Sequence, residues 1–337
     1  MPPAAPLDES VYFWTCNRGK RSVAADIAGA EGQANVARLA READVLIENY
    51  KVGTLARYGL DYATLAAANP RLIYCSITGF GQTGPYRERP GYDTIVQAMG
   101  GLMSITGNPD GEPGGGPRKS GIAAVDQMTA LYSTIAILAA VNERHGSGQG
   151  QHIDMSLLDV QVAALTNIGM NYLATGKTPR RQGNRLATVY PSDNFRCRDG
   201  DLMLIVGNDS QFRSICGALD MPEVAEDRRF ARNASRLENH EQLAPLIAHA
   251  FAKRTVAECQ ALLDAAGVPA SRINDVAQVF EDPQVMAREM VREVARPDGS
   301  KVRMIASPIR MSRTPPHSDR LPPALGQHTN DVNDGWS

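Results

Sequence analysis

The sequence predicts an α/β protein with a Rossmann-like, mainly parallel sheet, because strand-like segments alternate with amphipathic helices along residues 23–80. The expected strands are 23–27, 44–50 and 71–80, and the expected helices between them are 30–43 and 62–69. Parallel sheets of this kind bind their ligands beyond the carboxyl ends of the strands. The sequence therefore nominates the loops at 48–50 and 78–81 for binding.

The middle of the chain contains a flexible loop followed by a long apolar helix. Residues 106–121 include six glycines and three prolines, which predicts a surface loop. The apolar spacing after it indicates a helix over 128–144. The other expected elements are a helix at 94–105, a strand at 152–159, a second long helix to about Gly176, two short strands within 193–209, helices across 211–266, and a hairpin at 290–305 that turns at Pro297, Asp298 and Gly299.

A change of composition at residues 175–185 predicts a domain boundary. We expect a large α/β domain over 1–185 and a smaller α+β domain over 186–305. The tail over 306–337 is rich in proline, arginine and polar residues with little periodicity. It is expected to return to the large domain and to lie on its surface.

Composition excludes several classes of function. The net charge of −2 gives no basic field for nucleic acid or an acidic membrane surface. The five cysteines are scattered without a CxxC pair, and no HxxxH spacing occurs, which argues against a disulfide framework or a zinc site. No segment is expected to reach the about 20 apolar residues that cross a bilayer. We therefore expect a cytoplasmic protein without a metal, with no nucleic-acid partner and no membrane partner.

Asp126 is a lone carboxylate just before the apolar helix. The free N–H groups and the positive end of a helix stabilise an anion at such a position. A helix cap explains the residue equally simply. Both interpretations, cap and functional carboxylate, remain open at this point.

A cluster of basic residues precedes the first expected strand. Arg18, Lys20 and Arg21 lie within four residues of each other. The cluster is either a solvated turn or a phosphate site, since arginine and lysine pair with phosphate through charge-assisted hydrogen bonds. Arg57, in the loop after the second expected strand, is a candidate to join it.

Two other motifs are not expected to be functional. Residues 79–84 fit the pattern GxGxxG, but Pro85 follows where a dinucleotide fingerprint needs a helix. Nicotinamide or flavin binding is therefore not expected. His152 enters a strand as a lone histidine and is expected to pack, and no Ser–His–Asp set is evident.

Several strings in this sequence resemble the class III CoA-transferases, the CaiB–BaiF family. They are CNRGKRSVAADI, ADVLIENY, NPRLIYCSITGFGQTGPYRERPGYD, GLMSITGNPDG, the helix start at Asp126, GQGQHIDMSLLD and LGQHT at 325–329. The resemblance covers nearly the whole chain. It implies a Rossmann-like large domain, a smaller α+β domain and an interlocked homodimer, with acyl-CoA and a carboxylic acid as substrates and no permanently bound cofactor.

The resemblance also assigns roles to residues. It implies that Asp126 is a nucleophile that forms an acyl anhydride and then an aspartyl-CoA thioester. It places CoA contacts at Lys20, Asn49, Tyr50, Arg57 and Tyr58, and an assisting carboxylate at Asp93. The loop at 207–212 resembles the dicarboxylate branch, which moves CoA from succinyl-CoA to another dicarboxylic acid.

Two alternatives follow from departures from the family pattern. An α-methylacyl-CoA racemase needs a paired base, but its histidine is replaced here by Tyr92. Family members also open with a further segment that includes the first strand of the sheet. We therefore expect an uncovered sheet edge or apolar surface, and an inactive CoA-binding or scaffold protein is the second alternative.

Overall fold

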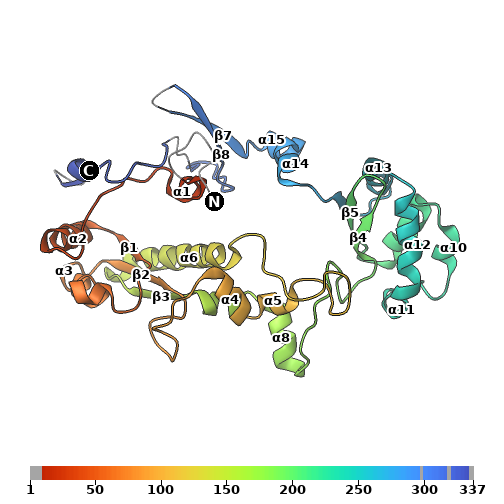
Figure 1. Cartoon of the computed structure of the whole chain (residues 1–337), viewed down its shortest axis with the longest axis horizontal. Coiled ribbons are helices and arrows are strands. Elements are labelled where there is room, and N and C mark those ends of the chain that lie inside the picture. Colours follow the sequence, from red (N-terminus) through yellow and green to blue (C-terminus); the bar gives the residue numbers. More distant parts are fainter. Residues whose placement is uncertain (1–9, 297–298, 317–319, 334–337) are drawn as a thin grey trace. The chain divides into compact units, whose positions relative to one another are not determined.

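The computed structural model describes residues 10–296, 299–316 and 320–333 (Figure 1). By its contacts the chain divides into two compact units. Unit 1 comprises Met1–Pro90, Thr129–Ser156 and Asp275–Ser337, and unit 2 comprises Gly91–Met128 and Leu157–Asn274. The division at 185 and 305 stays a prediction, and each unit is described by itself below.

Unit 1 contains a parallel three-stranded sheet in the order β1-β2-β3, as the alternating pattern predicts. The strands are β1 (Val45–Glu48), β2 (Ile73–Thr78) and β3 (His152–Ser156). Ile47 pairs with Cys75, and Cys75 with Ile153. The central strand β2 is almost entirely buried, whereas Ile47 on the edge strand is 58% exposed.

Two helices pack on the face of the sheet that contains Tyr74. They are α2 (Ala30–Glu42) and α3 (Tyr62–Ala68), with the short 3-10 helix η1 (Leu55–Tyr58) before α3. Ala40 of α2, Leu65 of α3 and Tyr74 of β2 form one buried cluster. Burial of these apolar side chains stabilises the layer by about 25 cal/mol per Å² removed from water.

The apolar helix α6 (Ala124–Ser147) is longer than the spacing predicts. Its last turn is fixed by Arg144, which is buried and donates to the carbonyl oxygens of Asp44 and Arg71 and to the Asp44 carboxylate at 2.7 Å. Arg144 therefore joins the end of the helix to the starts of β1 and β2.

The outward side of α6 is apolar and uncovered in this chain. Leu131, Ile135 and Leu138, spaced as one helix face, are 63–65% exposed. By length and composition alone, α6 also qualifies as a membrane-spanning segment, which differs from our expectation. The reason is that Asp126 and Glu143 lie near its two ends and leave the residues between them uncharged.

Three expected elements differ from the structure. Residues 23–27 are not a strand, because the N–H of Ala24 donates to the Thr329 hydroxyl instead of to a sheet neighbour. The helix expected at 94–105 is split into α4 (Asp93–Met99) and α5 (Leu102–Ile105), since Gly101 has a φ of 86°. The long helix after β3 is likewise split into α7 (Leu157–Ala163) and α8 (Thr166–Thr175).

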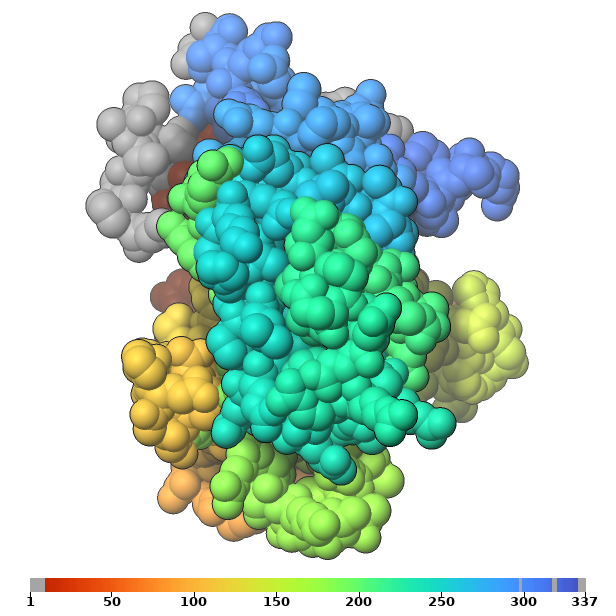
Figure 2. Space-filling view, turned by 90° about the vertical axis from the view of Figure 1, so that its right-hand side faces the viewer, coloured from red at the N-terminus to blue at the C-terminus, as the bar shows by residue number. Residues whose placement is uncertain are grey.

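Unit 2 contains a small antiparallel sheet covered by helices, with a core of its own. The strands are β4 (Ser192–Arg196), β5 (Asp201–Ile205) and β6 (Ala270–Arg272). The helices are α9 (Asp209–Ala218), α10 (Pro222–Glu226), α11 (Asn233–Glu238), α12 (His240–Ala252) and α13 (Val256–Ala265), which confirms the helical segment expected at 211–266. Figure 2 shows the packed surface of these helices in green and teal. Phe195 stacks on Phe251 at 4.9 Å inside this core.

The last part of the chain returns to unit 1. It contains α14 (Val276–Glu281), α15 (Pro283–Ala287), the hairpin β7 (Val291–Ala295) and β8 (Lys301–Ile305), and α16 (Thr329–Asn333), while α1 (Val11–Asn17) opens the described chain. The hairpin is confirmed, but two of its predicted turn residues, Pro297 and Asp298, lie outside the described residues. Ser22 exchanges hydrogen bonds with His328 and Gly326. The string LGQHT therefore holds the segment before α2.

Candidate active site

Asp126 lies in the first turn of α6, on an exposed position. The first turn of a helix leaves N–H groups without intrahelical partners. The backbone N–H groups of Val125 and Asp126 donate to Oδ2 of Asp93, at 2.9 Å and 3.2 Å. Asp93 therefore caps α6 from a neighbouring helix, and the interpretation of Asp126 as the cap is wrong.

The Asp126 carboxylate itself accepts no hydrogen bond from the residues that the structure describes. Burial raises the pKa of this carboxyl, and the negative charge of Asp93 raises it further. The N–H groups that were expected to stabilise the Asp126 anion are occupied by Asp93. Asp126 is therefore an accessible carboxylate whose charge is little compensated, and such a carboxylate is a stronger nucleophile than a bonded one.

The loop after β1 holds the next two predicted residues. Asn49 donates its side-chain N–H to the carbonyl oxygen of Ile77 at 2.7 Å and joins the ends of β1 and β2. The backbone N–H of Tyr50 donates to Glu48 at 2.8 Å, and the Tyr50 ring is 49% exposed. The two strand ends that the sequence nominated are thus adjacent, with an exposed aromatic ring beside them.

The other predicted CoA contacts also lie in unit 1. Arg57 is exposed in the last turn of η1, and its guanidinium has no partner among the described residues. Tyr58 is half-buried against the cluster of α2 and α3. Lys20 is exposed and donates to the side chain of Asn17 at 3.2 Å. Arg18 binds the carbonyl oxygen of Ile305, so one cation of the basic cluster has a structural contact.

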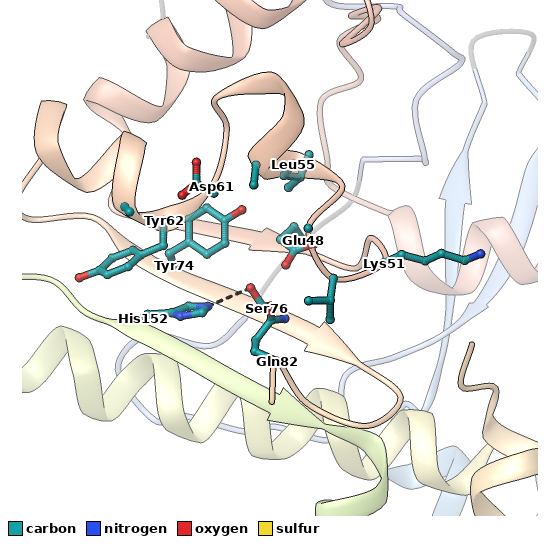
Figure 3. A pocket seen from close by; sticks show the side chains of 13 residues that line it. Glu48, Lys51, Leu55, Asp61, Tyr62, Tyr74, Ser76, Gln82 and His152 are labelled. Carbon is teal, nitrogen blue, oxygen red and sulfur yellow. Dashed lines mark hydrogen bonds between the residues drawn. The ribbon is translucent and has the colours of Figure 1, made fainter. Parts of the chain in front are cut away.

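A cavity of about 370 Å³ opens beside the loop after β1, within unit 1 (Figure 3). His152 stacks on Tyr62 at 5.2 Å and bonds to the hydroxyl of the buried Ser76 at 3.0 Å. Glu48 and Asp61 add negative charge, while Lys51 extends away from the other labelled side chains. The walls therefore disfavour a phosphate group and suit a neutral group.

Sequence reasoning missed this cavity wall. His152 packs against Tyr62, but it also bonds to Ser76, a residue that no motif singled out. The alternation of β2 gives the only signal, because Tyr74, Ser76 and Thr78 point to the same side of the sheet. The pairing of Tyr74 with His152 across β2 and β3 then brings the histidine to the same face.

The loop that fits GxGxxG does not open a helix. Residues 81–92 form turns and irregular chain, and the next helix begins at Asp93. Asp154 instead accepts hydrogen bonds from the N–H of Gln82 at 3.0 and 3.1 Å and fixes the loop. No helix therefore opens at Gly84, as the proline after it predicts. No cluster of three or more potential metal ligands occurs among the described residues.

The fold and these sites define an α/β enzyme with an accessible carboxylate at a helix N-terminus and a polar loop at the ends of parallel strands. The sequence profile of CoA-transferase family III matches residues 1–329. The chain belongs to this family and is a class III CoA-transferase.

Individual relatives agree with this assignment. A succinate–glutarate CoA-transferase of Agrobacterium fabrum is 46% identical over 319 residues, which cover 95% of this chain and 79% of that protein. A succinyl-CoA:glutarate CoA-transferase of Mus musculus is 38% identical, covering 96% and 73%. The crystal structure of a CaiB/BaiF family protein from Brucella suis superposes with a TM-score of 0.87 at 45% identity, covering 96% and 84%.

Proposed function

We propose that this enzyme moves CoA from succinyl-CoA to a second dicarboxylic acid, with Asp126 as the covalent nucleophile. The substrate class is supported by relatives named as succinyl-CoA transferases that act on glutarate, D-citramalate or mesaconate. The observation that supports the nucleophile most directly is the Asp126 carboxylate. It accepts no hydrogen bond in the described parts of the chain, because Asp93 occupies the helix N–H groups.

In the first half of the reaction, a carboxylate oxygen of Asp126 attacks the thioester carbonyl carbon of succinyl-CoA. The C–S bond breaks, and a mixed anhydride and the CoA thiolate form. The thiolate then attacks the aspartyl carbon of the anhydride. Succinate leaves as a carboxylate, and Asp126 holds CoA as a thioester.

The second half repeats these steps in reverse with the acceptor acid. Its carboxylate attacks the aspartyl thioester, CoA thiolate leaves, and the thiolate then attacks the acyl carbon of the acceptor. Asp126 is released as a carboxylate, and no net proton is taken up.

The charge of Asp93 assists these steps. Two like charges near one helix N-terminus repel each other. Acylation of Asp126 removes one of the two charges and relieves the repulsion, so Asp93 favours the covalent intermediates over the free carboxylate.

CoA binding is assigned to the loop after β1 and to two exposed basic residues of unit 1. Arg57 and Lys20 are the cations proposed for the phosphate groups, because phosphate pairs strongly with such side chains. The exposed ring of Tyr50, together with Asn49 and Tyr58, is proposed to supply contacts for the less polar part of the molecule. The cavity of Figure 3 has acidic walls and is not assigned to a phosphate.

The working unit is proposed to be a homodimer in the cytoplasm. The exposed row of Leu131, Ile135 and Leu138 on α6 is an apolar surface that a second copy of the chain would bury. The cytoplasmic location rests on composition and on the unpatterned cysteines. Light scattering of the purified chain tests the dimer.

A screen of acceptor acids against succinyl-CoA tests the proposed function. We expect a new acyl-CoA, identified by its mass, with a dicarboxylic acid as acceptor. The Asp126→Asn variant should fold and bind CoA but lose turnover by several orders of magnitude, since an amide does not form the anhydride. Binding of CoA without transfer to any acid would instead favour the inactive scaffold, and exchange of an α-proton would favour the racemase.

A further inference from the structure

Gln97 is completely buried in α4, and its amide is fully engaged. Its Nε2 donates to Oδ1 of Asp93 at 2.6 Å and to the hydroxyl of Ser120 at 3.2 Å. Its Oε1 accepts from the backbone N–H of Ser120 at 2.9 Å. Ser120 lies at the end of the glycine-rich loop, so one side chain joins Asp93 to the segment that leads into α6.

The two oxygens of Asp93 have separate partners. Oδ1 accepts from Gln97, and Oδ2 accepts from the N–H groups of Val125 and Asp126. A carboxylate held at both oxygens cannot rotate without losing hydrogen bonds. The amide of Gln97 at one oxygen and the two N–H groups at the other therefore fix together where the negative charge of Asp93 lies relative to Asp126.

We propose that Gln97 is a positioning residue that acts through Asp93 to hold a negative charge beside the nucleophile Asp126. The role as stated rests on the proposed function of Asp126. Gln97 touches neither the reacting carboxylate nor, as proposed, the substrate. It helps to fix the position of the Asp93 charge. That charge makes the Asp126 anion less stable and its acylation more favourable.

The electrostatics at Asp126 are simple enough to test this role. Among the described residues, Asp93 is the charged group that shifts the pKa of Asp126, in addition to burial. If Asp93 turns away, the pKa of Asp126 falls. Asp126 is then ionised at lower pH, and the acid limb of the rate profile moves to lower pH.

The test compares the Gln97→Met variant with the matched Gln161→Met variant. Gln161 is also a completely buried glutamine in unit 2, on α7, but its amide has no hydrogen-bond partner among the described residues. Both substitutions replace an amide by an apolar side chain of similar size. An effect of lost buried polarity alone should therefore appear in both variants. The hydrogen bond to Asp93 is lost only in Gln97→Met.

For Gln97→Met we expect kcat to fall roughly 10- to 100-fold, as for a misplaced catalytic group, with the KM for succinyl-CoA unchanged. The acid limb of kcat should move to lower pH. Gln161→Met should keep the parent profile. A reduced kcat with an unmoved acid limb would overturn the proposal, because a merely structural role predicts that result. If Gln97→Met does not fold, Gln97→Asn replaces it in the test. Its amide is one methylene too short to reach Asp93, so the acid limb of kcat should again move to lower pH.

A stability cycle separates this inference from the proposed function. Asp126→Asn removes the repulsion by Asp93, so it should raise the melting temperature at pH 7 in the parent chain. The increase should shrink in the Gln97→Met background, where Asp93 is no longer held in place. This readout needs no turnover. An equal increase in both backgrounds would overturn the role of Gln97, even if Asp126 proves to be the nucleophile.

Discussion

Oδ2 of Asp93 lies 3.2 Å from the backbone nitrogen of Asp126 and accepts its N–H. Two carboxylates thus share the N-terminus of α6, and the one from α4 takes the hydrogen bonds. The carboxylate of Asp126 accepts no hydrogen bond from the residues that the structure describes. The capping aspartate and the aspartate proposed to react are thus different residues at one helix end.

The Asp126→Asn variant should be more stable than the parent at pH 7. The pKa of Asp126 is raised in the folded state. Ionisation of Asp126 therefore lowers the free energy of unfolding of the parent, whereas the protonated carboxyl does not. The cost appears as pH rises through the unfolded value of about 3.9 and is complete above the folded pKa. Thermal melts of both proteins from pH 3 to 8 measure the difference.

The higher melting temperature of Asp126→Asn should vanish toward pH 3, where Asp126 of the parent is also neutral. A lower melting temperature for the variant at pH 7 would mean that Asp126 makes a stabilising contact as an anion. That result would contradict the assignment of the cap to Asp93.

Replacement of Arg57 or Lys20 by alanine should weaken CoA binding by about 1–3 kcal/mol each, because each removes a charge-assisted hydrogen bond to phosphate. Isothermal titration with CoA measures the loss. Arg41→Ala, an exposed arginine in the last turn of α2, is the control and should bind as the parent does. Parent-like affinity in both the Arg57 and Lys20 variants would remove the basic residues from the CoA site.

Asp209→Ala should destabilise unit 2 by about 1–3 kcal/mol. Asp209 accepts from the completely buried Arg236 at 2.8 Å. Without it, this cation keeps neutral partners among the described residues, namely the carbonyl oxygens of Tyr190 and Phe230 and the face of the Phe212 ring. The hydrogen bond from Arg236 lowers the pKa of Asp209. Its stabilisation is therefore present above the unfolded value of about 3.9 and is lost as pH falls through the folded value.

Chemical denaturation at pH 7 and pH 3 measures this effect. The control is Glu88→Ala, which breaks the solvent-exposed pair with Arg87 and should change stability little. Equal losses in the free energy of unfolding for the two variants would show that burial of Arg236 does not strengthen its ion pair.

The sequence was sufficient for the parallel sheet and for most helices of both units. It failed where contacts between distant segments replaced local preference. Residues 23–27 look like a strand, but the N–H of Ala24 donates to the hydroxyl of Thr329 in the tail, and the N–H of the preceding Ser22 donates to His328. The helix at 94–105 contains Gly100 and Gly101, and the local pattern did not show that the positive φ of Gly101 would break it.

The candidate site was predictable as a set of residues but not as a set of contacts. Asp126 and Asp93 were named from the family resemblance, whereas periodicity suggested only that Asp126 begins a helix. The cap by Asp93 and the bond from Gln97 depend on how α4 packs beside the start of α6. No spacing rule gives that packing, since α5 and a loop of irregular chain separate the two segments in the sequence.

Trapping of the acyl-enzyme shows which carboxylate becomes acylated. The enzyme is incubated with succinyl-CoA and hydroxylamine, which cleaves activated carboxyl derivatives, and the digested protein is mapped by mass spectrometry. If Asp126 is the nucleophile, a hydroxamate forms at Asp126, requires succinyl-CoA and is absent from the Asp126→Asn variant. A hydroxamate at another carboxylate, or turnover of Asp126→Asn at the parent rate, would contradict it.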